Sequence, residues 1–434
     1  MEHNNNKKQP AVLPSHKVQQ FINNVRVIEE MAKPEPNLDI LKSYQGFGGL
    51  KRCFWDKTLY GQIMRAIRAN FGAQREKSVL ESLRNSSNSA YYTPKEVINF
   101  IYRYVTQVCK FTGGDVLEPS CGNGAFFEYM PNEIRSNSNI TGIEYDTLTA
   151  KLVQSIYPDV NIINDGLQNI DLSCKKYDLI VGNPPYSAEK ITDNFMPDLN
   201  GYSIHHYFVA KCMRLLKNNG IMALVVPSFY MDIPQSNTRH IINDEAVVVD
   251  VVRLPDNLFE QATVTVDIIF IRKTGNKIHD ITQTTELVQD NAKDSINQFW
   301  INNPNRILGE LKLKWVECYK RHVPTCATKD KEQALRYLNL CEFTQTTIEN
   351  YQKIIATTTN QTQKNQAKTK AINDELLVIS KTEYTNLLAS ISEVFLEVEE
   401  LESLSKKLQQ RLEALHPKVW AVVEEFEEKI DIAS

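Results

Sequence analysis

Residues 177–186, YDLIVGNPPY, hold the pattern that decides the fold. The run up to Gly182 is mostly apolar and β-branched, which is typical of a strand buried on both faces of a parallel sheet. It is followed directly by Asn183, Pro184, Pro185 and Tyr186. Two consecutive prolines fix two φ angles and remove two backbone donors, so they form a rigid ledge. This ledge presents an amide, a backbone carbonyl and an aromatic ring in fixed relation, and a simple structural turn needs none of these.

Outward from this stretch, apolar strands alternate with helical periods between residues 91 and 275. Strands are predicted at 115–120, 139–146, 160–166, 177–185, 221–228, 247–254 and 265–273, and the main helices between them at 94–110, 147–157 and 204–218. Short Val- and Ile-rich runs separated by helices predict a mostly parallel sheet covered on both faces. The fold class is therefore α/β, a doubly wound Rossmann-like domain.

Polar and glycine residues stand where the first three predicted strands end. Gly122 and Gly124 follow the first strand, where glycines let the backbone approach a ligand, although the segment is neither G-x-G-x-x-G nor a P-loop. Glu144 ends the second strand. It is placed either to accept hydrogen bonds from ribose hydroxyls or to provide a negative charge near a helix N-terminus. Asp165 ends the third strand and can accept from an adenine amino group or form a plain Asp-Gly turn.

Read in order, six segments resemble the motifs of the amino-group DNA methyltransferases. They are YYTPKEVINF, DVLEPSCGNGAFF, GIEYD, NDG, DLIVGNPPYS and TVDIIFIRK. The Asn-Pro-Pro-Tyr form with the glycine loop ahead of it resembles the adenine-N6 class of the gamma motif order. The resemblance covers residues 91–274. YQGFGGLK and NPNRILGE resemble segments that flank the methylase region of large plasmid and phage helicase–methylase proteins.

The resemblance implies S-adenosylmethionine as cofactor and a flipped adenine in DNA as substrate. It assigns binding of the target base to a catalytic motif formed by Asn183, Pro184, Pro185 and Tyr186. In this motif Asn183 and the carbonyl of Pro184 are the acceptors and Tyr186 is the stacking residue. Phe259 is the candidate for a second aromatic wall. Gly166 departs from the family pattern, which often has a large apolar residue there that packs on the cofactor ring, and Leu167 is the candidate substitute. The implied cofactor-binding residues are Thr93, Pro94, Glu118, Cys121, Gly122, Gly124, Glu144 and Asp165.

Composition divides the rest of the chain. We expect a flexible head over residues 1–40, a helical segment over 41–90, the catalytic domain over 91–275, a candidate target-recognition region over 276–350 and a helical, coiled-coil region over 351–434. Basic residues gather in the fourth part, where phosphate contacts and an ordinary solvated face are both open readings. Apolar residues recur every three or four positions over 387–415, which predicts a helix for packing, for a homodimer or for a partner protein.

Net charge and cysteine spacing limit the remaining classes of function. The formal net charge is −4, so any DNA-binding surface must be local. The eight cysteines form no C-x-x-C pair, which argues against a zinc site and a disulfide framework and fits reduced thiols in a cytoplasm. The resemblance to plasmid and phage proteins implies that the protein is bacterial or phage- or plasmid-encoded. No run of eighteen apolar residues occurs, so no membrane association is expected. No metal is expected either.

Other functions remain open on sequence alone. An RNA adenine-N6 methyltransferase or a protein-glutamine methyltransferase also fits Asn-Pro-Pro-Tyr, although the glutamine enzymes resemble a cofactor loop beginning Asp-x-Gly, where this chain has Glu118 and Pro119. A non-catalytic DNA-binding or assembly protein on a methylase fold is a different class of alternative. Such a protein has no reason to keep both Glu144 and the Asn183–Tyr186 motif. A site-specific adenine DNA methyltransferase, within a restriction–modification or mobile-element system, is therefore the preferred reading.

Overall fold

A computed structural model describes residues 15–87, 92–234, 236–259, 264–274, 281–316, 320–328 and 330–340, together with residues 343, 348–349, 351–353, 356 and 414. The chain divides into a compact unit of residues 1–358 and a second unit of residues 359–434. The heptad-like stretch 387–415 lies outside the described residues except for residue 414, and its coiled coil stays a prediction.

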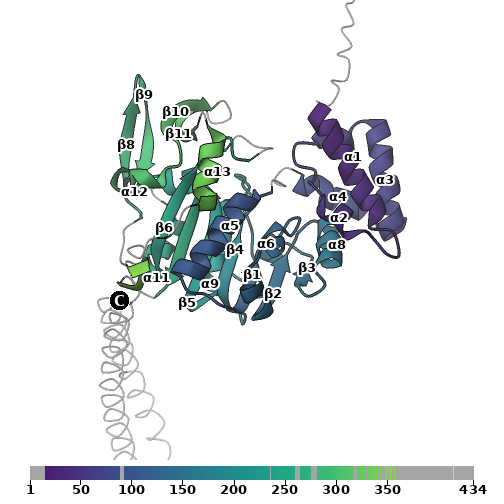
Figure 1. Cartoon of the computed structure of the whole chain (residues 1–434), viewed down its shortest axis with the longest axis horizontal. Coiled ribbons are helices and arrows are strands. Elements are labelled where there is room, and N and C mark those ends of the chain that lie inside the picture. Colours follow the sequence, from purple (N-terminus) through teal and green to yellow (C-terminus); the bar gives the residue numbers. More distant parts are fainter. Residues whose placement is uncertain are drawn as a thin grey trace, which may run out of the picture. The chain divides into compact units, whose positions relative to one another are not determined.

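Within the described residues, seven strands form the central sheet in the order β3-β2-β1-β4-β5-β7-β6 (Figure 1). All neighbours pair in parallel except β7, which runs antiparallel between β5 and β6. This is the doubly wound α/β fold that the sequence predicts. The strands are β1 (Gly114–Glu118), β2 (Ser138–Ile143), β3 (Asn161–Ile163), β4 (Tyr177–Gly182), β5 (Leu216–Pro227), β6 (Ala246–Leu254) and β7 (Val266–Lys273).

Successive side chains of the central strands enter opposite cores, which explains why these strands read as continuous apolar runs. In β4, Leu179 and Val181 join one buried cluster and Ile180 joins the other. The first cluster takes in α5 (Lys95–Arg103), the π-turn η2 (Tyr104–Val108), α6 (Ala125–Glu128), α7 (Asn132–Ser136) and α8 (Thr147–Ile156). The second takes in α9 (Ile204–Leu215), α10 (Phe229–Asp232), α11 (Asn237–Glu245) and α12 (Gln298–Asn302).

The N-terminal part differs from the prediction of a flexible head, because Ser15–Glu30 and Leu38–Lys42 are helices. Phe21, Val27 and Ile28 of α1 are buried in the same core as the first cluster. The amides of Gln20 and Asn24 donate to the carbonyl of Gly46 at 2.8 and 2.6 Å, so even the polar side of α1 is held by tertiary contacts. The helices are α1 (Ser15–Glu30), α2 (Leu38–Lys42), η1 (Lys51–Phe54), α3 (Lys57–Phe71) and α4 (Glu76–Ser86).

Residues 281–340 add hairpins and a helix beside the edge of the central sheet. The segment before β10 attaches to β6, where Leu308 N–H donates to Arg253 O at 2.9 Å and Arg306 pairs with buried Asp250 at 2.9 Å. NPNRILGE therefore joins this region to the sheet. The elements are β8 (Thr284–Gln289), β9 (Ala292–Asn297), η5 (Pro304–Arg306), β10 (Glu310–Val316), β11 (Arg321–Ala327) and α13 (Lys331–Leu340).

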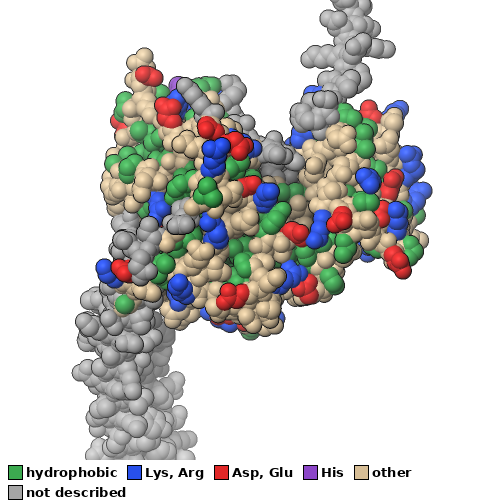
Figure 2. Space-filling view, viewed as in Figure 1, with side chains coloured by type: hydrophobic (Ala, Val, Ile, Leu, Met, Phe, Trp, Pro, Cys, Tyr) green, Lys and Arg blue, Asp and Glu red, His purple; other side chains and the backbone are tan. Residues whose placement is uncertain are grey.

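Several basic residues of this region already have acidic partners. Ion pairs join Lys314 to Asp256, Lys312 to Glu310 and Arg321 to Asp294, in addition to Arg306 to Asp250. Contact of these four with phosphate would require each to leave its carboxylate. On the face drawn in Figure 2, basic and acidic side chains are interspersed rather than gathered by sign. None of the described helices combines the length and the hydropathy that crossing a bilayer requires.

Candidate active site

Most of the predicted site residues lie at the carboxyl ends of β1, β2, β3 and β4, and the strand order reverses between β1 and β4. This is the position at which open α/β sheets bind ligands. A cavity of about 440 Å³ opens there. Its walls include five of the predicted residues, namely Gly122, Glu144, Asp165, Asn183 and Pro185.

The glycine turn after β1 can be built only with glycine at two positions. Gly122 and Gly124 have φ of +53° and +78°, in the left-handed region. A Cβ on Gly122 would lie 2.9 Å from the Tyr92 ring, and one on Gly124 would lie 2.6 Å from the Tyr157 ring. The backbone therefore passes close to its neighbours, and Gly122 leaves its main chain open to the cavity.

Glu144 ties this turn to the end of β2. Its Oε2 accepts the Gly122 N–H and its Oε1 accepts the Asp146 N–H, both at 2.8 Å. Burial, reinforced by the charge of Asp146, raises the pKa of Glu144 to about 7. A carboxylate offers about four lone-pair positions, so two remain after these bonds. The Glu144 carboxylate can therefore accept a pair of vicinal hydroxyls from the cavity.

Asp165 lies across the cavity on the segment after β3. Its Oδ1 accepts from Gly166 N–H at 2.7 Å and from Asn169 Nδ2 at 2.8 Å. The Asp165 side chain is exposed, so its other oxygen can receive a donor from a ligand. Leu167, the sequence-based substitute for the missing apolar residue at Gly166, also lines the cavity.

Glu118 and Cys121 lie beneath the turn rather than in the cavity wall. Glu118 is 1% exposed, and its Oε1 accepts the Ser120 N–H at 3.2 Å. Burial raises the pKa of the Glu118 carboxyl well above its ordinary value, and likewise that of the Cys121 thiol. Cys121 is thus a protonated, packed thiol, and both residues support the turn from below.

Asn183 and Tyr186 contact each other at the end of β4. The Tyr186 hydroxyl can donate to Asn183 Oδ1 and, at 3.0 Å, to the Val225 carbonyl. Burial raises the pKa of Tyr186 well above its usual value, with a further contribution from Asp267, so the hydroxyl keeps its proton. The backbone of Asn183 is held from the other side by Ser120, whose Oγ donates to the Asn183 carbonyl at 3.3 Å.

Thr93, Pro94 and Phe259 lie outside this cavity. They line a neighbouring cleft of about 870 Å³, and Tyr92 lines both hollows. Phe259 is buried and is not brought together with Asn183 in the wall of one cavity. The structure thus gathers Gly122, Glu144, Asp165, Asn183 and Pro185 around one cavity, whereas Pro184 and Tyr186 do not line it. Thr93, Pro94 and Phe259 line the neighbouring cleft.

The cavity also has walls that the sequence does not mark. Asn85 at the end of α4 and Tyr92 contribute from the N-terminal side, and Ile191, Ile204 and Phe208 contribute from the loop after the ledge and from α9. Tyr92 had one usable signal, its place just before Thr93. The others have none, because their approach to the cavity depends on tertiary packing.

His205 and His206, the other residues with potential for acid–base chemistry, are packing residues here. Burial lowers the pKa of His205 to about 4 and that of His206 to about 3, so both rings are neutral at physiological pH. His206 Nδ1 lies 2.6 Å from Thr238 Oγ1. Among the described residues, no group of three or more His, Cys, Asp or Glu side chains is arranged to hold a metal ion.

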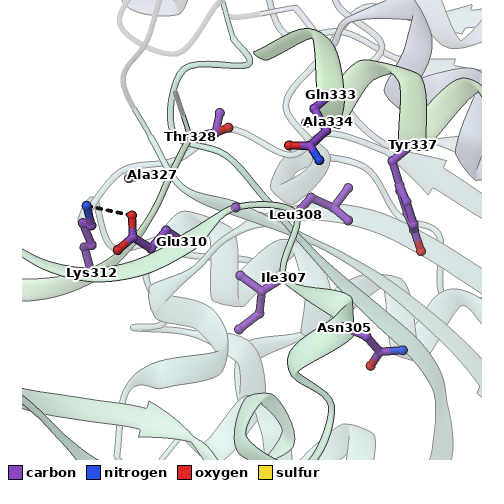
Figure 3. Close-up of a pocket in the computed structure, with 11 residues that line it drawn as sticks. Asn305, Ile307, Leu308, Glu310, Lys312, Ala327, Thr328, Gln333, Ala334 and Tyr337 are labelled. Carbon is purple, nitrogen blue, oxygen red and sulfur yellow. Dashed lines mark ion pairs between the residues drawn. The ribbon is translucent and has the colours of Figure 1, made fainter. Parts of the chain in front are cut away.

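A further hollow of about 540 Å³ lies between hairpin β10–β11 and α13, away from these residues (Figure 3). Ile307, Leu308 and Glu310 of NPNRILGE line it together with Tyr337 of α13, and Glu310 is paired with Lys312. It holds none of the predicted site residues.

The sequence is similar to DNA methyltransferases over part of its length. The chain is 28% identical over 198 residues to the type II methyltransferase M.CvrRI of Paramecium bursaria Chlorella virus XZ-6E, covering 45% of this chain and 51% of that protein. It is 28% identical over 158 residues to the modification methylase CviBIII of Paramecium bursaria Chlorella virus NC1A, covering 35% and 41%. The chain thus spans about half the length, or less, of these curated relatives.

Among solved structures, a modification subunit of a putative type I restriction enzyme from Vibrio vulnificus YJ016 aligns over 64% of this chain and 66% of its own, at 18% identity and a TM-score of 0.37. The N-6 DNA Methylase family model matches residues 78–375, more than half of the chain and all of the site described above. The chain belongs to the N-6 DNA methylase family.

Proposed function

We propose that this protein transfers a methyl group from S-adenosylmethionine to the exocyclic N6 amino group of an adenine flipped out of DNA. The cofactor follows from the family. The observation that carries the proposal is that Asn183 and Pro185 of the ledge line the same cavity as Glu144 and Asp165. A nucleoside-binding end and an amino-group-binding end therefore share one hollow.

The residues of the cavity fit the nucleoside part of the cofactor. Glu144 has acceptor positions left for the two ribose hydroxyls, and Asp165 can accept from the adenine amino group. Gly122 leaves its backbone accessible beside them. We place the methionine part toward Tyr92, where the cavity meets the cleft lined by Thr93 and Pro94.

Asn183 and Pro184 act on the amino group of the target base. That nitrogen is a poor nucleophile, because its lone pair is delocalised into the purine ring. The Asn183 Oδ1 and the Pro184 carbonyl can each accept one amino hydrogen and so favour a nitrogen whose lone pair points at the methyl donor. Both acceptors bind more strongly as positive charge grows on nitrogen, so they stabilise the transition state preferentially. The surplus amino proton leaves to water after transfer.

S-adenosylmethionine supplies an electrophilic methyl group on a sulfonium sulfur. The protein supplies the alignment, because the proline ledge fixes the acceptors and the cavity fixes the nucleoside. An adenine inside a duplex cannot reach the ledge, so the base must be flipped, at a cost of a few kcal/mol. Stacking on Tyr186 would offset about 1–3 kcal/mol of this cost.

We also propose that the protein works in the cytoplasm, in a restriction–modification or mobile-element setting. Its similarity to a viral protein named as a modification methylase supports this setting. The region over 276–350 stays the candidate for target recognition. Residues 387–415 stay the candidate for a homodimer or for partner binding, which sedimentation of the full chain would test.

The test is direct chemistry on nucleic acid. Unmethylated genomic DNA and total RNA are each incubated with the protein and with S-adenosylmethionine labelled in the methyl group, and nucleosides are separated after digestion. Label in N6-methyladenine from DNA is the expected result, and long-read sequencing then maps the site. Label in RNA alone would mean that RNA, not DNA, is the substrate. Absence of label in adenine from both DNA and RNA would contradict the proposed activity. Asn183→Ala serves as the inactive control.

A further inference from the structure

A fully buried ion pair contacts the segment that follows Asp165 and carries Leu167 of the cavity wall. Lys211 of α9 and Asp193 are both 0% exposed, and Lys211 Nζ lies 2.7 Å from Asp193 Oδ2. The ammonium group also donates to the carbonyl of Leu167 at 2.7 Å and to that of Ile170 at 3.4 Å. The three protons of Lys211 thus reach three acceptors, two of them on the segment that follows Asp165.

Asp193 organises the loop between the ledge and α9. Its Oδ1 accepts from Phe195 N–H at 2.8 Å and from Met196 N–H at 2.9 Å, and its Oδ2 accepts from the Tyr207 hydroxyl at 2.6 Å. Burial would raise the pKa of Asp193, but the hydrogen bonds from Lys211 and Tyr207 hold it below its ordinary value. The carboxylate is therefore charged and fully engaged.

The loop is also closed by its own backbone. Ile191 N–H donates to Tyr202 O at 3.1 Å, and Gly201 N–H donates to Ile191 O at 3.0 Å. Ile191 stands two residues before Asp193 and lines the cavity. Its position is thus fixed by the strand-like bridge on one side and by the Asp193 contacts on the other.

The ion pair consequently joins separate walls of one cavity. Leu167 lines it from the segment after β3, Ile191 from the loop, and Ile204 and Phe208 from α9, the helix that carries Lys211. These apolar side chains lie on the same cavity as Asp165. They provide the apolar contact area that Gly166 cannot.

Stability alone does not account for charges at this place. Burying an ion pair costs desolvation that mutual attraction offsets only with complete hydrogen bonding, and well-packed apolar residues often serve stability as well or better. A charged pair does what apolar packing cannot: it holds two specific backbone carbonyls and two specific N–H groups in register. The pair is suited to setting the spacing between Leu167 and Ile191.

We propose that Lys211 and Asp193 are positioning residues for the methyl donor, because they hold the Leu167 and Ile191 walls at the spacing that grips its purine ring. This inference rests on the proposed function. Neither residue touches the reacting atoms. Their effect is on the affinity for the adenosine part of the cofactor.

Lys211→Met removes the charge and keeps most of the side-chain volume. Calorimetry with S-adenosylhomocysteine and with 5′-methylthioadenosine, which lacks the amino-acid part, should show both dissociation constants raised by a similar factor of about ten or more. The KM for S-adenosylmethionine should rise in parallel, while the KM for DNA and kcat at saturating cofactor change far less. A loss confined to the amino-acid-bearing ligand would overturn the proposal.

Ile191→Ala shortens one side chain of the cavity wall and leaves the ion pair intact. If Lys211→Met fails to fold, the affinity of Ile191→Ala for the two nucleosides provides the test. Arg306→Met is the matched control, since it breaks a pair with buried Asp250 on β6, away from the cavity. Affinity within twofold of wild type in a folded Lys211→Met or Ile191→Ala, or an equal loss in Arg306→Met, overturns the inference. Wild-type protein that binds neither nucleoside overturns the proposed function as well.

Discussion

The hydroxyl of Tyr186 donates to the amide oxygen of Asn183, the same oxygen that the proposed reaction needs for the amino group of adenine. The proposed catalytic acceptor is therefore already hydrogen-bonded to the residue that we propose stacks on the incoming base. Val225 O, 3.0 Å from the hydroxyl, offers Tyr186 a second acceptor. Base entry thus exchanges one hydrogen bond of Asn183 for another rather than filling an empty position.

Tyr186→Phe should make that exchange easier. The ring remains for stacking, but the flipped base no longer displaces a hydroxyl, and one hydrogen bond contributes about 0.5–1.5 kcal/mol. The extrahelical fraction of a target base should rise by about two- to tenfold, read by 2-aminopurine fluorescence at the mapped site with S-adenosylhomocysteine bound. Tyr186→Ala should reduce this fraction, because it removes stacking. A Phe variant that flips less than wild type would mean that the hydroxyl holds the base instead.

Asn183→Ala should lower kcat by about 10²–10³, the usual loss when an acceptor or donor at developing charge is removed. The ledge is stiffened by its prolines, so the fold and the nucleoside end should persist. Single-turnover methylation measures the rate, and calorimetry with S-adenosylhomocysteine should give an affinity within about twofold of wild type. Turnover within tenfold of wild type would remove Asn183 from the mechanism.

The site could be predicted from sequence where topology alone gathers residues. Gly122, Glu144, Asp165 and Asn183 stand at the ends of four parallel strands, and such ends meet at one edge of a sheet whatever the side-chain packing. The apolar runs also predict the strands well, because β4 and its neighbours are buried on both faces.

The features that the sequence does not predict depend on contacts between residues that are distant in the chain. Gln20 and Asn24 look like solvent-facing residues of a loose head until the carbonyl of Gly46 is in place to accept their hydrogen bonds. Lys211 and Asp193 carry no local signal, because a lysine inside a helix pattern reads as exposed until a buried acceptor is known. Phe259, the sequence candidate for a second aromatic wall, lies in the neighbouring cleft.

Binding of the cofactor should weaken as pH falls below 7. Burial raises the pKa of Glu144 to about 7 in the folded protein, and only the charged carboxylate can accept from both ribose hydroxyls while it holds Gly122. Affinity for S-adenosylhomocysteine should therefore fall by up to about tenfold per pH unit below this pKa. Calorimetry at pH 6, 7 and 8 measures the trend. Glu144→Gln should bind weakly and lose the dependence.

When no cofactor is bound, the Glu144 carboxyl should have the opposite pH dependence: it should stabilise the folded protein less, not more, as the pH rises. A folded-state pKa above the unfolded value contributes stability that is fully present below about pH 4.5 and is lost as pH rises through about 7. The shift in Tm caused by S-adenosylhomocysteine should accordingly be larger at pH 8 than at pH 6. An equal shift at both pH values would mean that Glu144 does not meet the ribose.

Gly122→Ala should damage the cavity more than its small size suggests. The added Cβ would lie 2.9 Å from the Tyr92 ring, at a φ of +53° that an L-residue adopts only with strain. Gly201→Ala separates these two effects, because Gly201 has φ of +83° and nothing within 4 Å of the added carbon. Both variants should lose stability to backbone strain, of about 1–3 kcal/mol.

Gly122→Ala alone should also lose cofactor affinity, because Tyr92 can move away from the new methyl group only by shifting the wall that it shares between the cavity and the cleft. Thermal unfolding and S-adenosylhomocysteine titration of the two variants provide the comparison. Adding Tyr92→Ala to Gly122→Ala removes the clash but neither the backbone strain nor the loss of the wall, so affinity should stay low. If the double variant bound the ligand as wild type does, the ring of Tyr92 would not be needed as a wall, and the loss of affinity in Gly122→Ala would come from the clash alone.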